Sequence, residues 1–552
     1  MTTLDTGREA AGDGDPRTAA PLPQGQVDYA GQPWVRGNDY SVLEPPVLGG
    51  WTPVLSVSVV IPAHGHQEKL DLVLAALAGQ SYPGHLMEVV VVDDGSPEPL
   101  VLPQVRPENT RLISSGPGGW GSAHAVNCGV AASSGQVVLR LDADMVVYRE
   151  HVESQMRWHH LVDYGVVLGH KLFVDFVPGA MTPDHVRTEV AEGRADTLFD
   201  RESANPHWVE KTIDRQDKLR TAASQAYKVF VGATGSLHRG LFEAAGRMDP
   251  GMVLGGDTEF GYRLSQQGAV FVPDLDTSSW HLGSSQMQSR REEGKRYRLP
   301  YVANRVPDYG PRRELPGRAW EVPLVDAVLD VEGRTLEEVE ATASALLGGT
   351  TPDLRLWLVG PWENLDGGRR SPLDEEWLDL RLVGETFRGD ARVHLVEEVP
   401  EEDPRVPFRL HVPTGTGLSP VAVADLVREA DKHKAGLLCA PLPGTARAED
   451  GFLRLERASA RARARRLVPE AEGKELDRAV EEVHGTHWMP AERFVVATAA
   501  EDDPEQLRKL REELARAQAD ADRQRARAKR AERKLRWFTP GLARRALRRI
   551  AR

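Results

Sequence analysis

Three short runs of β-branched and aliphatic residues in the first quarter of the chain most constrain its fold. They are VSVVIP (57–62), MEVVVV (87–92) and VVLRL (137–141). Residues 66–80 and 122–135 lie between these runs, and each has apolar positions at helical spacing with a glycine near its end. Strands that alternate with helices predict an α/β fold, in which a parallel sheet is covered by crossover helices.

Polar or turn-forming residues follow each predicted strand, at the edge of the sheet where ligands of such folds bind. These residues are Pro62, Ala63, Asp93, Asp94, Asp142 and Asp144. A buried carboxylate without a partner is unfavourable. Two carboxylates one residue apart, a DxD pattern, can instead hold Mg²⁺ or Mn²⁺ against phosphate oxygens, although a solvated turn is the alternative. We therefore expect a divalent metal at this edge.

Two later segments add candidate groups to this site. His281 follows the strand-like run AVFVPDL (269–275) and is a candidate metal ligand, with a packed or capping histidine as the alternative. Asp257 stands at the start of a predicted helix, where it can act as a general base, as a helix cap, or as both. Glu259 is expected to pair with Arg263 four residues on.

Four motifs in order, VSVVIPAHG, VVVVDDGS, LDADM and LGGDTEFGYRL, resemble family 2 glycosyltransferases over about residues 55–290. The last motif and GWGSAHAVNCG (119–129) are most similar to bacterial chondroitin-polymerase-like and galactosyltransferase-type domains. The resemblance implies a GT-A (nucleotide-diphospho-sugar transferase, Rossmann-like) catalytic domain. It also implies inverting transfer from a nucleotide-sugar, with a UDP-sugar favoured, to a glycan or lipid-linked acceptor in cell-surface polysaccharide synthesis.

The resemblance assigns roles to particular residues. Nucleotide-sugar binding is implied for Pro62, Ala63, Asp93, Asp94, Asn127 and Asp142. Metal binding is implied for Asp144 and His281, and the general base is Asp257. Further contacts to the donor or acceptor are expected from Trp120, Gly256 and Glu259. Relatives often have Glu-Asp where this chain has Gly256-Asp257, which leaves some of those contacts open.

Two other function classes remain as alternatives. A sugar-phosphate nucleotidyltransferase would need a glycine-rich, arginine-bearing loop after the first strand, where this chain has PAHGHQEK (62–69). A non-catalytic glycosyltransferase-like scaffold would not need Asp144, Asp257 and His281, all of which are present. The stretch GPGGWG (116–121) has the spacing of a dinucleotide-binding loop, but it does not follow the first strand.

A second set of segments resembles the first and predicts an internal repeat. The pairs are 323–349 with 56–80, 353–363 with 87–97, 408–415 with 138–145 and 484–494 with 231–242. In this comparison His411 and Pro413 stand where Asp142 and Asp144 stand, and Val359-Gly360 replaces Asp93-Asp94. We therefore predict a degenerate GT-A-like α/β domain that is structural or binds the acceptor. An unrelated α/β domain is the alternative.

The expected order of domains follows from these segments. It is a disordered arm (1–50), a GT-A glycosyltransferase domain (51–300), a linker (301–320), the degenerate GT-A-like domain (321–498), a coiled-coil helix (501–536) and a basic amphipathic helix (537–552).

Net charge and cysteine content limit the expected partners and the cellular compartment of the protein. The net charge of −13 disfavours a protein that coats nucleic acid, and two isolated cysteines favour a reduced, cytoplasmic setting. Residues 501–536 carry an alanine-rich heptad pattern, which predicts a weak coiled-coil dimer or a single charged helix. Residues 537–552 contain five arginines and no acidic residue, which predicts peripheral contact with the inner face of the cell membrane. A solvated basic tail is the alternative.

Overall fold

The computed structural model describes residues 21–284, 290–309, 313, 318–365, 371, 373, 375–442 and 451–496. The predicted coiled-coil helix and basic helix lie outside these residues. The compact unit that ends at Val495 holds two α/β domains, which we call the first domain (residues 51–309) and the second domain (residues 318–495). None of the described helices is long and apolar enough to cross a membrane.

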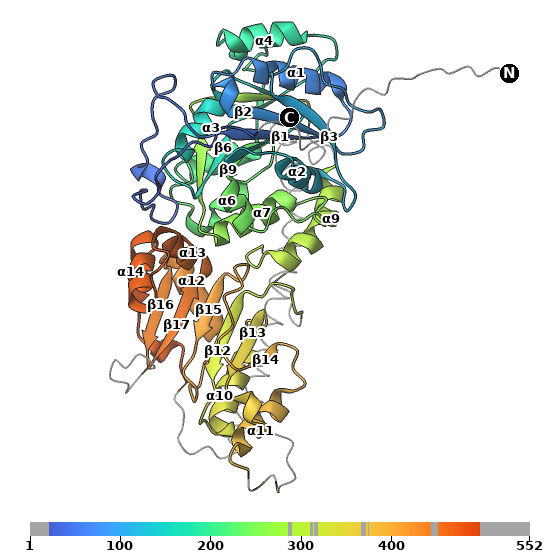
Figure 1. Ribbon diagram of the computed structural model, residues 1–552. Helices are drawn as coiled ribbons and strands as arrows, with labels where there is room; N and C mark the ends of the chain where they lie inside the picture. The colour runs from blue at the N-terminus through green and yellow to red at the C-terminus, as the bar shows by residue number, and fades with distance from the viewer. Residues whose placement is uncertain are drawn as a thin grey trace, which may run out of the picture. The chain divides into compact units, whose positions relative to one another are not determined.

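The first domain is built on a seven-stranded sheet in the order β3-β2-β1-β4-β9-β6-β10 (Figure 1). All neighbouring strands are parallel except β9, which is antiparallel to both β4 and β6. Its strands are β1 (Val57–Ala63), β2 (Met87–Asp93), β3 (Thr110–Ser114), β4 (Val137–Leu141), β6 (Gly165–Gly169), β9 (Thr234–His238) and β10 (Val270–Asp274). The α/β class with a largely parallel sheet, predicted from the alternation of strands and helices, is confirmed.

Helices cover both faces of this sheet, so its central strands are apolar on both sides. Val59 of β1 belongs to the core that includes α1, and the neighbouring Val60 belongs to the core that includes α2 and α7. The helices are α1 (Gln67–Ala78), α2 (Ser122–Ala131), α3 (His151–His159), α4 (Pro183–Ala191), α5 (Trp208–Arg215), α6 (Arg239–Ala244), α7 (Gly256–Gln266) and α9 (Arg291–Arg305). The predicted linker (301–320) thus begins inside α9.

A small four-stranded sheet in the order β5-β11-β7-β8 lies beyond the end of β4 in the chain and carries the candidate metal ligand. Its strands are β5 (Met145–Val147), β7 (Leu172–Val174), β8 (Asn205–Pro206) and β11 (Ser279–Leu282). His281 on β11 is paired with Met145 on one side and Phe173 on the other. Because β5 begins at the residue after Asp144, this pairing brings His281 to the DxD motif.

The second domain repeats the strand order of the first, as β14-β13-β12-β15-β17-β16-β18, and β17 is again antiparallel to its neighbours. Its strands are β12 (Val325–Asp330), β13 (Leu354–Val359), β14 (Val393–Val396), β15 (Phe408–His411), β16 (Leu437–Pro441), β17 (Phe452–Arg457) and β18 (Thr486–Trp488). Its helices are α10 (Leu336–Leu347), α11 (Leu378–Phe387), α12 (Ala422–Lys432), α13 (Ala458–Leu467) and α14 (Gly473–Val483).

The ladder register changes how the two domains correspond. Val57 pairs with Val137 in the first sheet, and Val325 pairs with Phe408 in the second. The alignment of β1 with β12 is supported by a glycine with positive φ eight residues after the start of each strand, at Gly65 (+65°) and Gly333 (+66°).

With this register His411 takes the position of Arg140, and Pro413 takes that of Asp142. The correspondence predicted from the sequence was therefore two residues out. A shift of two keeps every side chain on its own face of the sheet, so the apolar pattern could not detect it. Residues 484–494 were also wrongly matched to β9, because β17 takes the place of β9 and β18 that of β10.

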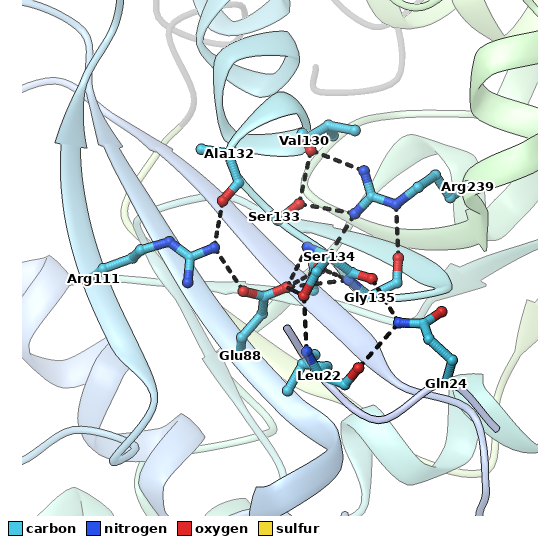
Figure 2. A network of polar contacts seen from close by, with 11 residues as sticks. Leu22, Gln24, Glu88, Arg111, Val130, Ala132, Ser133, Ser134, Gly135 and Arg239 are labelled. Carbon is cyan, nitrogen blue, oxygen red and sulfur yellow. Dashed lines mark hydrogen bonds and ion pairs between the residues drawn. The ribbon is translucent and has the colours of Figure 1, made fainter. Parts of the chain in front are cut away.

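Residues 21–50 are packed on the first domain, so the prediction of a disordered arm over 1–50 is wrong for these residues. The amide of Leu22 donates to Ser134 Oγ (3.1 Å), and Gln24 Nε2 donates to the Ser134 carbonyl (3.1 Å), as Figure 2 shows. Further along, Tyr40 is buried and its hydroxyl donates to the carbonyl of Lys218 (2.6 Å). The polar composition of the sequence hid the anchors at Leu22 and Gln24.

Glu88 organises a buried polar cluster at the beginnings of β1, β2 and β4 (Figure 2). Its carboxylate accepts from Ser58 Oγ (2.7 Å) and from the amides of Ser134 (2.7 Å) and Gly135 (3.1 Å), and it pairs with Arg111 (2.7 Å). Burial opposes the charge, but these donors outweigh it and lower the pKa of Glu88 below its ordinary value. The cluster fixes the edge of the sheet opposite the candidate site.

Candidate active site

The carboxyl ends of β1, β2 and β4 lie side by side and form the floor of the candidate site. Ala63 pairs with Asp93, and the amide of Asp94 donates to the Ala63 carbonyl (2.9 Å). Pro62, which lacks an amide donor, precedes this contact at the end of β1. The amide of Asp142, directly after β4, donates to the carbonyl of Ala233 (2.9 Å). The strand register therefore brings these strand ends together, as predicted from the sequence.

Asp94 is buried and keeps one carboxylate oxygen for a ligand. Its Oδ2 accepts from the amide of Gly121 (2.7 Å), while Oδ1 is buried and has no hydrogen-bond partner among the described residues. Its carbonyl accepts from Trp120 Nε1 (3.1 Å) and contacts His64 Nδ1 (3.2 Å). The Trp120 ring is 55% exposed. An unpaired acceptor beside an exposed aromatic face suits an N–H or O–H donor on a planar or sugar ring.

Asp93 has its two carboxylate oxygens on backbone amides. Oδ1 accepts from Ser96 (2.8 Å) and Oδ2 accepts from Leu100 (3.2 Å). Burial opposes the charge, but the hydrogen bonds from Ser96 outweigh it and lower the pKa of Asp93. Asp93 thus shapes the loop that follows β2, next to the buried, unpaired oxygen of Asp94.

Asn127 on α2 is held by the main chain of a single residue. Its Nδ2 donates to the carbonyl of Met248 (2.7 Å), and its Oδ1 accepts from the amide of Met248 (3.1 Å). Both ends of the amide are engaged, so the structure gives Asn127 the role of tying α2 to the segment that leads to α7. The sequence suggested a side chain pointing into the cleft.

Asp144 and His281 face each other across the start of the small sheet. His281 Nε2 lies 3.5 Å from Asp144 Oδ1, and His281 Nδ1 lies 3.1 Å from the carbonyl of Gly283. Burial lowers the pKa of His281, which favours the neutral imidazole. If Nδ1 carries the proton toward Gly283, the lone pair of Nε2 faces Asp144, which is the tautomer that a metal ligand requires.

Two residues that the sequence did not single out support this pair. The ring of Phe173 stacks on His281 with a centroid distance of 4.3 Å, which fixes the imidazole plane. Lys69 on α1 places Nζ 3.7 Å from Asp144 Oδ2 and donates to the carbonyl of Leu282. Its ammonium can therefore also interact with a negatively charged ligand that lies next to Asp144. The lysine lies in the HQEKLDL segment, where it looks like an ordinary surface residue.

Asp257 lies in the first turn of α7 and is linked to β4 by Arg140. Asp257 Oδ1 forms an ion pair with Arg140 Nη1, and Oδ2 accepts from the amide of Gly232 (3.0 Å). Arg140 Nη2 lies 3.2 Å from Asp142 Oδ1. Gly232 leaves room for this arrangement, because a Cβ at that position would lie 1.9 Å from the guanidinium of Arg140.

Asp142 has an unusual acidity. Burial raises its pKa to about 6; Arg140 lowers it, while Asp144 and Asp257 raise it. The guanidinium of Arg140 is thus the shared ion-pair partner of Asp142 and Asp257. Arg140 was missed because it lies inside the apolar run VVLRL, although an arginine directly before a DxD pattern was a usable signal.

The remaining candidates near Asp257 are structural in their contacts. Glu259 forms the predicted pair with Arg263 through two short bonds (2.5 and 2.7 Å), and Arg263 also donates to the carbonyl of Arg247 (2.6 Å). Gly256 is the first residue of α7 and is buried. Neither residue presents an open polar group comparable with Asp94 Oδ1.

Lys171 is a second buried cation that the sequence did not reveal. It directly precedes β7, so it shares a strand face with Phe173, whose ring covers His281. It is 3% exposed, and burial lowers its pKa, while the charges of Glu210, Asp142 and Asp257 act in the opposite direction. No hydrogen bond or ion pair of its ammonium is found among the described residues. Lys171 therefore supplies positive charge behind the DxD motif.

Residues 58–195 match the family model described as Glycosyl transferase family 2. No curated protein matches the chain.

Solved structures that match include three sugar transferases. One is the mannosyltransferase PcManGT from Pyrobaculum calidifontis in complex with GDP-Man and Mn²⁺ (18% identity, TM-score 0.32, 49% of this chain and 66% of that one). Another is TarS from S. aureus (17%, 0.29, 45% and 66%). The third is GalNAc-T7 with UDP, GalNAc and Mn²⁺ (16%, 0.31, 47% and 51%). This chain spans about two thirds or less of the length of these structures.

Proposed function

We propose that this chain, whose residues 58–195 form a Glycosyl transferase family 2 domain, is a metal-dependent, inverting glycosyltransferase. Its donor is a nucleotide-sugar, with a UDP-sugar favoured, and its acceptor is a hydroxyl of a glycan or lipid-linked glycan in cell-surface polysaccharide synthesis. One observation carries the proposal. An unpaired buried acceptor on Asp94, the facing pair of Asp144 and His281, and Asp257 all lie at the carboxyl edge of one sheet.

The donor's base and ribose are assigned to the end of β2. Asp94 Oδ1 would accept from an N–H of the base, and Trp120 offers an exposed ring face beside it. Pro62 and Ala63 form the adjoining floor at the end of β1. Asp93 contributes indirectly, by holding the loop of Ser96 and Leu100 in place.

Asp144 and His281 would hold Mn²⁺ or Mg²⁺ together with oxygens of the donor diphosphate. The donor set fits, since it joins one carboxylate to an imidazole whose other nitrogen contacts a carbonyl. Among the described residues no group of three or more ligating side chains is present, so the donor and water would complete the coordination. When bound, the ion stabilises the negative charge of the leaving diphosphate. Lys69 adds a cation at the same place.

Asp257 would act as the general base. As the acceptor oxygen bonds to the anomeric carbon, the bond from that carbon to the diphosphate oxygen breaks, and the hydroxyl proton moves to Asp257. A single displacement of this kind inverts the anomeric configuration. Each carboxylate oxygen has two lone pairs, so the contacts with Arg140 and Gly232 leave capacity for the hydroxyl. Arg140 holds the side chain of Asp257 in its orientation through their ion pair.

A screen of nucleotide release tests this function. Full-length protein is incubated with UDP-, GDP- and dTDP-sugars, with Mn²⁺ or with EDTA, and released nucleotide is measured. We expect release from one donor only, dependent on Mn²⁺, and lost in Asp144→Ala. Asp217→Ala, which removes an exposed carboxylate outside the site, is the matched control.

Donor binding separates the alternatives if no nucleotide is released. Mn²⁺-dependent binding in calorimetry, lost in Asp144→Ala, would support an enzyme that requires its acceptor. No binding by any donor would favour the non-catalytic scaffold. Release of pyrophosphate from a nucleoside triphosphate and a sugar phosphate would establish the nucleotidyltransferase instead.

The C-terminal tail remains a separate proposal based on its sequence. We propose that residues 537–552 bind anionic lipid at the inner face of the cell membrane, since they carry five arginines and no acidic residue. Weak dimerisation through residues 501–536 would place two such tails together. Deletion of 537–552 should abolish sedimentation with phosphatidylglycerol vesicles at low salt. Unchanged sedimentation would contradict the proposal.

A further inference from the structure

A cavity of about 1130 Å³ lies in the second domain, at the carboxyl ends of its parallel strands. Asp330 of β12, Val359 of β13 and His411 of β15 line it, together with Gly473 at the start of α14. The two sheets have the same strand order, so this cavity takes the place that the candidate active site takes in the first domain. Ligands of open α/β sheets bind at this edge.

None of the carboxylates of the first site is retained at the corresponding positions. The ladder register places Gly360 and Pro361 at the positions of Asp93 and Asp94, so the match of Val359-Gly360 predicted from the sequence was one residue out. It likewise places Pro413 and Gly415 at those of Asp142 and Asp144. Because α7 begins at Gly256 and α14 at Gly473, Lys474 takes the position of Asp257. A cavity with these residues has neither a metal site nor a general base of the first kind.

Five arginines line the cavity instead, and three of them are already paired. Arg454 pairs with Glu456 (2.6 Å) and Asp477 (2.6 Å). Arg461 bridges Glu402 (2.8 Å) and Glu456 (3.2 Å). The third paired residue, Arg465, lies 2.9 Å from Glu402. These pairs fix the wall of the cavity and neutralise Glu402 and Glu456, two of its four acidic lining residues; Asp330 and Glu401 are the other two.

Arg334 and Arg409 are different, because neither has an ion-pair partner among the described residues. Arg409 donates only to the carbonyl of Glu401 (3.1 Å), and Arg334 is exposed at the rim. On β15, Arg409 shares a face with His411, while Phe408 and Leu410 point into the core. A guanidinium stays charged at all physiological pH values and binds phosphate or carboxylate through two parallel hydrogen bonds.

Apolar side chains complete the lining. Val328, Val399, Val412, Pro413 and Phe452 provide surface on which the C–H face of a sugar ring can pack. The volume exceeds that of a single sugar, so a chain of two or more units can enter. The cavity therefore joins a sugar-compatible surface to two unpaired cations.

We propose that this cavity binds a sugar chain that carries phosphate or carboxylate groups, with Arg334 and Arg409 as the anion ligands and without a metal. The second domain then holds an anionic glycan without reacting with it. That this glycan is the acceptor rests on the proposed function of the first domain; that the cavity binds an anionic sugar does not.

Saturation-transfer NMR on the full-length protein in EDTA tests the proposal, since the chelator keeps sugar phosphates from using a metal in the first domain. The probes are glucose 1-phosphate, glucuronic acid and glucose. We expect binding of at least one anionic probe, with glucose at least about tenfold weaker. The stronger anionic probe shows whether phosphate or carboxylate is preferred.

Three variants locate the binding. Arg334→Ala should weaken binding of the anionic probe, and the double variant Arg334→Ala/Arg409→Ala should weaken it further, to about tenfold below the unaltered protein. Arg428→Ala, which removes an exposed arginine from α12 of the same domain, is the matched control and should bind as the unaltered protein does. Because Arg334 is exposed, its single variant tests the site even if the double variant does not fold.

Two results would overturn the proposal: no anionic probe that binds more tightly than glucose, or binding that persists unchanged in Arg334→Ala and the double variant. Mn²⁺-dependent nucleotide release is measured in parallel on matched samples without EDTA and should be unchanged in Arg428→Ala. Absence of both nucleotide release and Mn²⁺-dependent donor binding in all samples would reject the function of the first domain and leave the result on the cavity standing.

Discussion

Arg140 forms an ion pair with Asp257 and so joins strand β4 to the start of helix α7. The same guanidinium lies 3.2 Å from Asp142, the first residue of the DxD motif. A buried arginine between two carboxylates fixes their separation through charge-assisted hydrogen bonds. The proposed base and the proposed diphosphate site therefore share one cation. A substitution at one of them should alter the electrostatics of the other.

Replacing Arg140 by Gln should move the acid limb of the pH profile of kcat/KM upward by about 1–3 pH units. Burial raises the pKa of Asp142 to about 6 although Arg140 lowers it, so loss of this positive charge should raise that pKa further and protonate the carboxylate at a higher pH. The measurement is transfer between pH 5 and pH 9 with saturating Mn²⁺. Arg149→Gln, at a half-exposed arginine paired with Glu150, is the control. An acid limb that stays in place would refute the coupling.

Replacing His281 by Phe should remove the metal response while keeping the fold. The aromatic ring can still stack on Phe173, so the unfolding temperature should stay close to that of the unaltered protein. Loss of outer-shell groups typically weakens metal binding or activity by about 10–100-fold, so loss of a direct ligand should weaken Mn²⁺-dependent release by about 100-fold or more. His185→Phe, on exposed α4, is the control. A normal Mn²⁺ titration in His281→Phe would exclude this ligand.

The sequence located the acidic residues of the site because they follow apolar runs, where strand ends must converge. Asp94 and Asp144 are of this kind, whereas Asp257 stood out at the start of a predicted helix. Arg140 and Lys171 could not be found in this way, because each lies within or beside an apolar run and the acidic residues that influence it include ones distant in the chain. Spacing along the chain carries no information on such partners.

The repeat illustrates a second limit. The order of strands in the second domain follows from the same succession of apolar runs, yet His411 was placed two residues from its true counterpart, Arg140. Side-chain alternation has a period of two, so only the hydrogen-bonded register distinguishes these alignments. The anchors at the start of the N-terminal arm, such as Leu22 on Ser134, were likewise invisible, because each uses a backbone amide or carbonyl on one side.

Replacing Lys171 by Met should make the folded protein more stable but weaken its use of the donor. A buried ammonium without a partner among the described residues is unfavourable, so an apolar side chain of similar length should raise the free energy of unfolding by about 1 kcal/mol. This corresponds to about 2–4 °C in a domain of this size. The KM for the donor should rise, because positive charge behind Asp142 is lost. Lys211→Met, on α5, is the control. A less stable variant with unchanged kinetics would mean that Lys171 serves the fold alone.

Replacing Glu88 by Gln should destabilise the first domain at neutral pH but much less in acid. The contacts with Ser58, Ser134 and Arg111 favour the carboxylate, and loss of the charge should lower the free energy of unfolding by about 2 kcal/mol at pH 7.

These contacts hold the pKa of Glu88 in the folded protein below the ordinary 4.5 of the unfolded chain. The stabilisation is therefore complete above pH 4.5 and is lost as the pH falls through the folded-state pKa. Urea unfolding at pH 7 and at successively lower pH values measures the difference between the two proteins, with Glu98→Gln, an exposed glutamate in the loop after β2, as the control. A difference that does not shrink as the pH falls would show that shape, and not charge, makes Glu88 important.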